Sequence, residues 1–276
     1  MISAGTRVAA VIGSPVRHSL SPALHNAGFS ATGVDWVYTA FEVAPGDAGA
    51  ALDAMRVLGF GGLSITMPHK EDVAALVDEL DPAASALRSV NTVVPLGDGR
   101  LKGYSTDGAG FIASLAAQGV ETVGRRVCVL GGGGAARAIV EALARSGASA
   151  VTVVNRSAER ARAAAQLAGA IGAVGVAGDV ADCDIVINAT SLGMGTTELP
   201  CDAGALHSGQ VVADIVYHPR RTALLIAAER VGARTVEGLG MLVHQAVLQQ
   251  HLWTGTNPDP AVMWSAAERE LASRPQ

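Results

Sequence analysis

Lys70 stands where an apolar, strand-like run gives way to a polar, helical one. The run in the segment GGLSITMPHKEDV (61–73) ends at Thr66, and the helical pattern begins after Met67 and Pro68. A lysine ammonium at such a place can stabilise a developing alkoxide and supply a proton to it. It can equally be a surface charge, because lysine side chains are normally exposed. The sequence around Lys70 leaves both interpretations open.

A glycine-rich loop has the features of a dinucleotide site. Gly131, Gly133 and Ala136 form the pattern G-x-G-x-x-A after an apolar run and at the start of a helical one. The first glycine allows a tight turn, the second lets the backbone approach a pyrophosphate, and the small third residue allows the helix to pack closely on the strand. The helix N-terminus adds free N–H groups. A flexible turn is the plainer interpretation, but the strand–loop–helix–strand order favours nucleotide binding.

The residues after the next expected strand indicate which dinucleotide binds. An NAD site usually has Asp or Glu there, about 20 residues after the glycines, to accept hydrogen bonds from the ribose. Here Asn155 and Arg156 take that place, and Arg160 follows one turn later. Two guanidinium groups can neutralise a 2′-phosphate that a carboxylate would repel. Unless they are ordinary surface charges, these residues predict NADP.

The segment GSPVRHSLSPALHN (13–26) is polar at a strand-to-helix junction. Ser21 before Pro22 predicts a helix N-cap, because proline suits the first helical position. That structural role leaves Ser19 without an explanation.

Asn91 and Asp107 are further polar residues near the ends of expected elements. Asn91 lies in an apolar strand-like run, where its amide must be hydrogen-bonded. Asp107 begins a helical segment, where capping alone could account for it.

The composition limits the class of protein. The chain has 276 residues, 49% of them hydrophobic, and a formal net charge of −5. The length predicts two domains with large cores, and the negative charge argues against nucleic acid as a partner.

Cys128, Cys183 and Cys201 lack metal-binding spacing, and we expect Cys128 and Cys183 in the core. Because no signal-like start and no long apolar run is seen, we expect a cytoplasmic protein without a membrane partner.

Expected strands and helices alternate along the chain. Strands are expected at 8–13, 36–43, 62–66, 150–156, 184–190 and 211–217, with a hairpin around the turn 97–100 and a strand–loop–helix unit at 125–148. Helices are expected at 21–33, 46–59, 70–80, 103–119, from 158 onward, at 238–255 and at 259–271. Strands alternating with helices of this length predict an α/β fold with parallel sheet.

These segments resemble, in order, the motifs of the shikimate dehydrogenase family. The matching motifs are GSPVRHSLSPALHN, LSITMPHK, SVNTVV, YSTDG, LGGGGAARA, NRSAER, INATSLGM, ADIVYHPRRTAL and EGLGMLVHQA. The resemblance implies reversible, NADP(H)-dependent reduction of 3-dehydroshikimate to shikimate, in the route to aromatic amino acids. It also implies an N-terminal α/β substrate domain (1–102 with 238–276), interrupted by a Rossmann-type NADP domain (103–237), with the C-terminal helices returning to the first domain.

The resemblance also assigns roles to residues of this sequence. Lys70 and Asp107 correspond to the catalytic pair, and no metal is implied. The residues that correspond to substrate contacts are Ser19, Ser21, Thr66, Lys70, Asn91, Asp107, Tyr217 and Gln245. The serines and Tyr217 would hold the substrate carboxylate, and the side chains of Lys70, Asn91, Asp107 and Gln245 the ring hydroxyls. The residues that correspond to cofactor contacts are Gly131, Gly132, Gly133, Gly134, Ala135, Asn155, Arg156, Ser157, Arg160, Thr190, Ile215 and Gly238.

Three histidines lie near these motifs. His69 is adjacent to Lys70, but neighbouring side chains at a strand-to-helix junction should point apart, so we do not expect it to be the acid. We expect His18 and His25 to hydrogen-bond within the fold, because buried polar groups are normally paired.

Four positions depart from the family pattern. They are Ser64 and Ser105, where many members carry asparagine, Pro82, where an acidic residue often contacts cofactor, and Gly132, which makes the loop four glycines long. The two serines border the expected substrate pocket and leave open a quinate/shikimate or aminoshikimate dehydrogenase. A non-catalytic NADP(H)-binding sensor is the other alternative, although a sensor has no chemical reason to keep Lys70 and Asp107. We expect a monomer or a homodimer.

Overall fold

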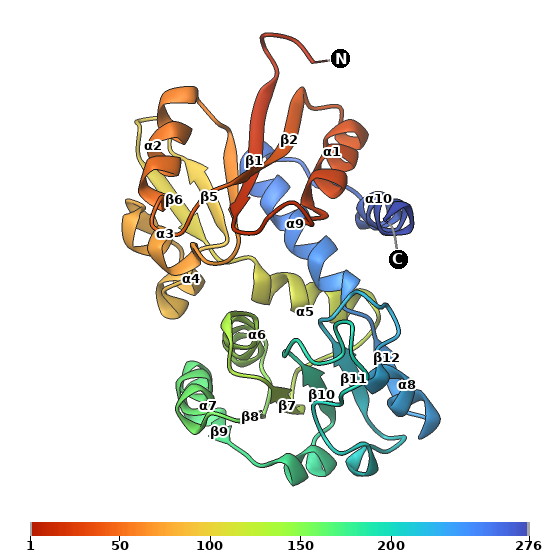
Figure 1. Cartoon of the computed structure of the whole chain (residues 1–276). Helices are drawn as coiled ribbons and strands as arrows, with labels where there is room; N and C mark the ends of the chain where they lie inside the picture. The colour runs from red at the N-terminus through yellow and green to blue at the C-terminus, as the bar shows by residue number, and fades with distance from the viewer. Residues whose placement is uncertain (1, 275–276) are drawn as a thin grey trace. The chain divides into compact units, whose positions relative to one another are not determined.

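The chain folds into two compact units in the computed structural model, which describes residues 2–274. Unit 1 contains the residues up to Thr106 together with those from Val243 onward, and unit 2 contains Asp107–Leu242. Each unit is built on its own six-stranded sheet with helices around it (Figure 1). The expected α/β fold with two domains is therefore confirmed. The functional limits at 102/103 and 237/238 remain a prediction.

Unit 1 begins with three parallel strands separated by helices. Its strands are β1 (Arg7–Gly13), β2 (Trp36–Glu42), β3 (Gly62–Ile65), β4 (Glu79–Leu80), β5 (Thr92–Pro95) and β6 (Leu101–Tyr104). Its helices are α1 (Ser21–Thr32), α2 (Ala48–Leu58), α3 (Lys70–Leu76), α4 (Pro82–Leu87), most of α9 (Leu239–Thr254) and α10 (Pro260–Ser273). The strand order is β2-β1-β3-β5-β6-β4. Only β5 runs antiparallel to its neighbours, which confirms the expected hairpin around 97–100.

Both faces of the unit 1 sheet are covered, as the alternation of side chains in β1 requires. Ala10 and Ile12 face a core formed with α2 and α3, whereas Ala9 and Val11 face a second core that contains Phe29 of α1 and Trp253 of α9. Figure 1 shows α2 and α3 on one side of this sheet and α1, α9 and α10 on the other. The chain thus returns from unit 2 to complete the core of unit 1.

Unit 2 is a parallel α/β unit. Its strands are β7 (Arg126–Leu130), β8 (Ala150–Val154), β9 (Gly172–Val174), β10 (Ile185–Asn188), β11 (Val211–Asp214) and β12 (Arg234–Val236). Its α-helices are α5 (Asp107–Ala117), α6 (Gly134–Arg145), α7 (Ala158–Ala165) and α8 (Ala223–Arg230), with short 3-10 helices at Gln166–Ile171, Ala177–Asp182 and Ala203–Ala205. Cys128 and Cys183 are buried, as expected.

The strand order of unit 2 is that of a dinucleotide-binding fold. The order β12-β11-β10-β7-β8-β9 is parallel throughout, so the chain moves outward from β7 to one edge and then from β10 to the other. The order therefore reverses between β7 and β10. In such sheets the ligand binds at the carboxyl ends of the strands beside this reversal.

Three local expectations were wrong. The helix expected at 103–119 begins only at Asp107, because Gly103 and Tyr104 still pair with β5. The helix expected at 70–80 ends at Leu76, because Glu79–Leu80 adds to the sheet beside β6. Ser21 is not an N-cap: it is the first helical residue of α1, and Leu20 occupies the cap position.

No helix in the described part of the chain is both long and apolar enough to cross a bilayer.

Candidate active site

The predicted catalytic and substrate residues of unit 1 follow its strands at one edge of the sheet. Ser19 follows β1, and Thr66 and Lys70 follow β3. Asn91 immediately precedes the antiparallel β5, so it lies at the same edge. Thr106, the last residue of this unit before Asp107 begins unit 2, follows β6. The topology therefore brings these chain segments to one edge.

Backbone hydrogen bonds tie these loops together. The N–H of Thr66 donates to Ile12 O at 3.0 Å, and the N–H of Ile65 donates to Asn91 O at 2.8 Å. The N–H of Val90 donates to Lys70 O at 2.9 Å. The position of Lys70 at the start of α3 is thus fixed by β5 as well as by β3.

Asn91 is buried and hydrogen-bonded, as the sequence predicted. Its Oδ1 accepts from the N–H of Thr106 at 2.8 Å and from the hydroxyl of Thr92 at 2.8 Å. Because a backbone N–H can only donate, these bonds fix which amide atom is Oδ1. They also connect Asn91 to the residue directly before Asp107.

Ser19 and Ser21 share one turn at the entrance to α1. Ser19 Oγ accepts from the N–H of Ser21 at 3.2 Å. Ser21 is buried and its side chain hydrogen-bonds to Tyr38 on β2. Gln245 lies on α9 and is buried.

Two of the three histidines discussed above have side-chain hydrogen-bond partners within the fold. His69 is fully buried, and its Nε2 lies 2.8 Å from Val43 O. His25 is also buried and bonds Gln249 at 3.1 Å, as expected. The expectation for His18 was wrong: its side chain is exposed, and no hydrogen bond to it occurs within residues 2–274. His18 follows β1 in a loop that turns it toward solvent.

The glycine loop of unit 2 joins β7 to α6 in the predicted way. Gly131 has a left-handed φ of 128°, and a Cβ there would lie 2.7 Å from Ala189 O, so only glycine fits. Gly133 occupies the N-cap position of α6 and offers no side chain to its N–H groups. A Cβ on Gly133 or Gly134 would meet no protein atom within 4 Å. Open space beside the helix N-terminus fits a pyrophosphate.

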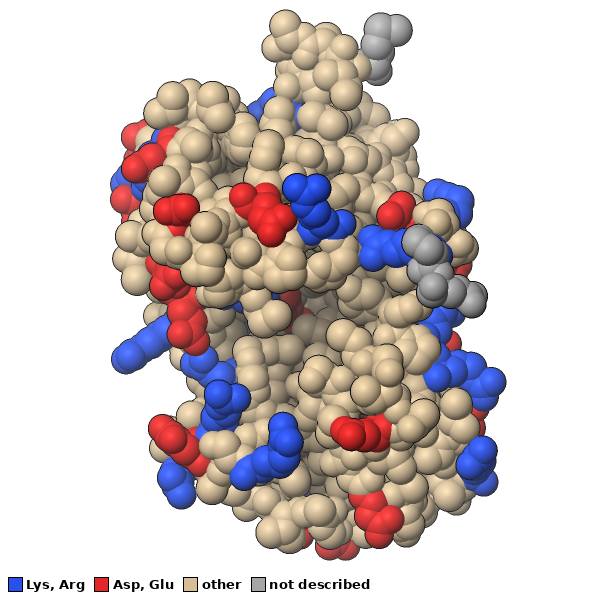
Figure 2. Space-filling model, in the orientation of Figure 1, with Lys and Arg blue, Asp and Glu red and all other residues tan. Residues whose placement is uncertain are grey.

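The segment after β8 has the composition of a 2′-phosphate site. Ser157 caps α7 by accepting from the N–H of Arg160, and Asn155 Nδ2 donates to Ser157 O at 3.0 Å. Arg156 and Arg160 are exposed, and neither has a carboxylate partner among residues 2–274. Figure 2 shows basic side chains gathered over the α7 side of unit 2. An unneutralised guanidinium pair here fits a dianionic phosphate.

The remaining predicted cofactor residues lie at the ends of β10 and β11. Thr190 follows β10, and its hydroxyl donates to Asn188 Oδ1 at 2.7 Å. Ile215 follows β11, and a Cβ on Gly238 would meet its carbonyl atoms at 2.5 Å, so Gly238 permits a close backbone approach. Tyr217, a predicted substrate residue, comes two residues after Ile215.

The sequence did not predict a buried carboxylate at the end of β11, which holds together the segments after β10 and β11 in unit 2. Asp214 is 1% exposed and accepts from Asn188 Nδ2 at 2.9 Å, from the N–H of Val216 at 2.9 Å and from the hydroxyl of Thr222 at 2.7 Å. Burial raises the pKa of Asp214, and the three donors oppose that rise. The only available signal was an acidic residue at the end of an apolar strand.

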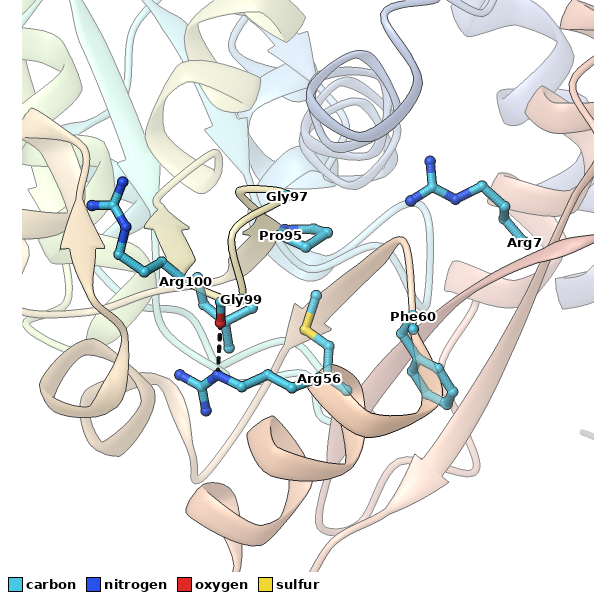
Figure 3. A pocket seen from close by; sticks show the side chains of 10 residues that line it. Arg7, Arg56, Phe60, Pro95, Gly97, Gly99 and Arg100 are labelled. Atoms are coloured by element: carbon cyan, nitrogen blue, oxygen red, sulfur yellow. Dashed lines mark hydrogen bonds between the residues drawn. The ribbon is translucent and has the colours of Figure 1, made fainter.

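A cavity lies at the opposite edge of the unit 1 sheet. It has a volume of about 380 Å³ and is lined by the start of β1, the turn before β3 and the β5–β6 hairpin (Figure 3). The guanidinium groups of Arg7, Arg56 and Arg100 do not converge in it. Arg56 instead donates to Gly99 O, and Arg100 pairs with Asp98 and Glu79. This cavity is separate from the predicted site.

Comparison with known proteins matches both units to one family. Residues 11–93 match the shikimate dehydrogenase substrate binding domain, residues 114–195 the shikimate / quinate 5-dehydrogenase family, and residues 238–268 the shikimate 5'-dehydrogenase C-terminal domain. The NADP(+) shikimate dehydrogenase of Moorella thermoacetica is 44% identical over 95% of this chain and 92% of its own.

Solved structures agree with this match. Shikimate 5-dehydrogenase from Thermus thermophilus, in complex with NADP(H) and shikimate, is 35% identical with a TM-score of 0.91, covering 96% of this chain and 100% of its own. Quinate dehydrogenase from Corynebacterium glutamicum, in complex with NAD, is 33% identical with a TM-score of 0.90, covering 96% and 99%. Because a full-length curated relative is more than 40% identical and the family models fall in both units, the chain belongs to the shikimate dehydrogenase family.

Proposed function

We propose that the chain reduces 3-dehydroshikimate to shikimate through Lys70 and Asp107. The enzyme is an NADP-dependent shikimate dehydrogenase, and the reaction is reversible. Full-length identity to NADP(+) shikimate dehydrogenases is the observation that carries this function. The quinate and sensor alternatives are not favoured by these relatives.

Lys70 supplies the proton that ketone reduction requires. When NADPH is bound it provides the hydride for the carbonyl carbon, so a proton must reach the carbonyl oxygen. The Lys70 ammonium stabilises the developing alkoxide and donates that proton. Asp107 orients the ammonium and binds a ring hydroxyl. Lys70 is half-buried at the sheet edge, where water is partly excluded.

The polar residues around this pair hold the substrate in place. Ser19, Ser21 and Tyr217 bind its carboxylate by hydroxyl donation. Thr66, Asn91 and Gln245 bind its hydroxyls. The fixed orientation of the Asn91 amide supports this role, because a preorganised donor loses little entropy on binding.

The cofactor side uses backbone and guanidinium groups. The loop Gly131–Ala135 and the start of α6 bind the pyrophosphate, and Arg156 and Arg160 bind the 2′-phosphate. Asn155 and Ser157 border the ribose, while Thr190, Ile215 and Gly238 line the nicotinamide side.

Nicotinamide absorbance tests the function directly. Shikimate with NADP should give rapid reduction of the cofactor, and quinate or NAD should be much poorer. Equal rates with quinate would contradict the assignment of substrate. Sedimentation of the same sample distinguishes a monomer from a homodimer. We expect the protein to be cytoplasmic in either state.

A further inference from the structure

A buried side-chain amide connects the two ends of the predicted substrate site in unit 1. Gln249 of α9 is 2% exposed. Its Nε2 donates to Asn91 O at 3.1 Å and to the Thr92 hydroxyl at 2.9 Å. Its Oε1 accepts from the Ser64 hydroxyl at 2.8 Å and lies 3.1 Å from His25 Nε2. Every hydrogen-bonding position of this amide is therefore occupied.

The direction of each hydrogen bond in this network is fixed. The backbone carbonyl of Asn91 can only accept, so the nitrogen of the Gln249 amide must face it. The Gln249 oxygen then faces His25, which must carry its proton on Nε2. Thr92 accepts from Gln249, so its own hydroxyl proton goes to Asn91 Oδ1 at 2.8 Å. Reversal of the Gln249 amide would break these bonds together.

The other arm of the network reaches the expected carboxylate anchor. The Tyr38 hydroxyl donates to Ser64 Oγ at 2.6 Å, and the Ser64 hydroxyl donates onward to Gln249. Ser21 also hydrogen-bonds to Tyr38. A continuous chain thus runs from Ser21, through Tyr38, Ser64, Gln249 and Thr92, to Asn91.

We propose that Gln249 is a positioning residue that sets the orientation of Asn91, and through Ser64 and Tyr38 that of Ser21, for substrate binding. This inference depends on the proposed substrate roles of Asn91 and Ser21. Gln249 itself does not touch substrate, because its amide is buried and saturated. Its contribution is to keep the Asn91 amide in one orientation and the Ser21 hydroxyl in one place.

The departure at position 64 fits this role. Many family members carry asparagine there, whereas Ser64 has a hydroxyl and no amide. In this chain the amide at that place comes from α9 instead, since Gln249 Oε1 lies against the Ser64 hydroxyl. The Ser64 hydroxyl is therefore used within the network.

The adjacent residue provides a matched control. Gln250 is also fully buried on α9, but its Nε2 donates to Thr32 at 3.1 Å, outside the network. Gln249→Met and Gln250→Met each remove one buried amide, and both should lower the melting temperature. Only Gln249→Met should raise the KM for shikimate, by about tenfold, which corresponds to about 1.4 kcal/mol. The KM for NADP should stay unchanged in both.

A second variant keeps the proposal testable if Gln249→Met does not fold. Ser64→Asn combined with Gln249→Ala moves the amide from α9 to β3 and retains the buried polar group. We expect this double variant to bind shikimate within about threefold of the parent chain, whereas Gln249→Ala alone loses about tenfold. A double variant that is folded but no better than Gln249→Ala would overturn the proposal.

Asn91→Ala separates failure of this inference from failure of the site assignment. If Asn91→Ala raises the KM for shikimate and Gln249→Met does not, Gln249 is only structural. An equal rise in KM for Gln249→Met and Gln250→Met also overturns the proposal. If Asn91→Ala itself leaves the KM unchanged, the substrate assignment of Asn91 is wrong, whatever Gln249 does.

Discussion

Gly132 and Arg160 are packed against each other across the glycine loop of unit 2. A Cβ on Gly132 would lie 3.0 Å from the Cβ of Arg160 and 3.1 Å from its carbonyl carbon. The first turn of α7 therefore rests on the loop itself. The additional glycine, which is a departure from the family pattern, thus leaves room for Arg160 to pack directly on the loop.

Replacing Gly132 by Ala should therefore weaken NADP binding. The added methyl group must displace Arg160 or the loop by a few tenths of an ångström, and we expect the KM for NADP to rise about three- to tenfold. The KM for shikimate should change much less. Gly178→Ala is the control, because a Cβ there meets no atom within 4 Å. If Gly132→Ala leaves the KM for NADP unchanged, the contact has no functional consequence.

Arg156 should determine the preference for NADP over NAD. A charge-assisted hydrogen bond contributes about 1.5–3 kcal/mol, so Arg156→Ala should weaken NADP binding at least tenfold. NAD has no 2′-phosphate, and its binding should hardly change. Arg162→Ala, an exposed arginine in the last turn of α7, is the matched control and should affect neither cofactor. An equal loss for both cofactors would show that Arg156 is only a surface charge.

Patterns along the chain predicted most of this architecture, because hydrophobic periodicity and glycine loops are local. The path from β7 to α6 and the buried Asn91 are examples. The Gln249 network was not predictable in the same way, because its members come from α1, β2, β3, β5 and α9. Only the folded chain brings Gln249 to Thr92, which is 157 positions away. Ser21 shows the converse error: a local capping rule assigned the wrong role to a residue whose partner is Tyr38.

Removing Lys70 should lower turnover strongly and spare the fold. If Lys70 donates the proton, Lys70→Ala should lower kcat by about 10²- to 10⁴-fold. The KM should change far less, since the interaction is made mainly in the transition state. Asp107→Asn should be similarly harmful, and the double variant little worse than either single one, because the two residues act as a unit.

Lys102 provides the control for Lys70, because these two are the only lysines in the sequence. Lys102 is on β6 and forms a surface ion pair with Glu79 at 3.7 Å. Such exposed pairs contribute little to the free energy of folding, about 0–1 kcal/mol. Lys102→Ala should therefore remain folded and retain normal kcat. The melting temperature of each variant must be compared with that of the parent chain. A folded Lys70→Ala enzyme with near-normal kcat would disprove the proton-donor role.

His25 should make the stability of the protein fall in mild acid. Burial lowers the pKa of His25 to about 3, partly offset by its hydrogen bond to Gln249, whereas the ordinary value is 6.5. Unfolding therefore takes up a proton between these two values. The stabilising contribution is complete above about pH 6.5 and is lost progressively as the pH falls toward 3, by about 1.4 kcal/mol per pH unit.

The free energy of unfolding in urea should be measured for the parent chain and for His25→Asn between pH 6 and 4.5. Groups that titrate identically in both proteins cancel in the difference, so the difference reports the titration of His25 alone. The variant has lost packing against Tyr38, whose ring stacks on His25 at 4.3 Å, so it should be less stable at every pH. That loss does not depend on pH, whereas the imidazole contribution does. The difference in unfolding free energy should therefore shrink as the pH falls. His251→Asn, at an exposed site on α9, is the control for the His-to-Asn substitution itself. If the difference for His25→Asn is constant too, His25 takes up its proton in the folded state at an ordinary pH. The added proton, on Nδ1, would then be buried without an acceptor among the described residues.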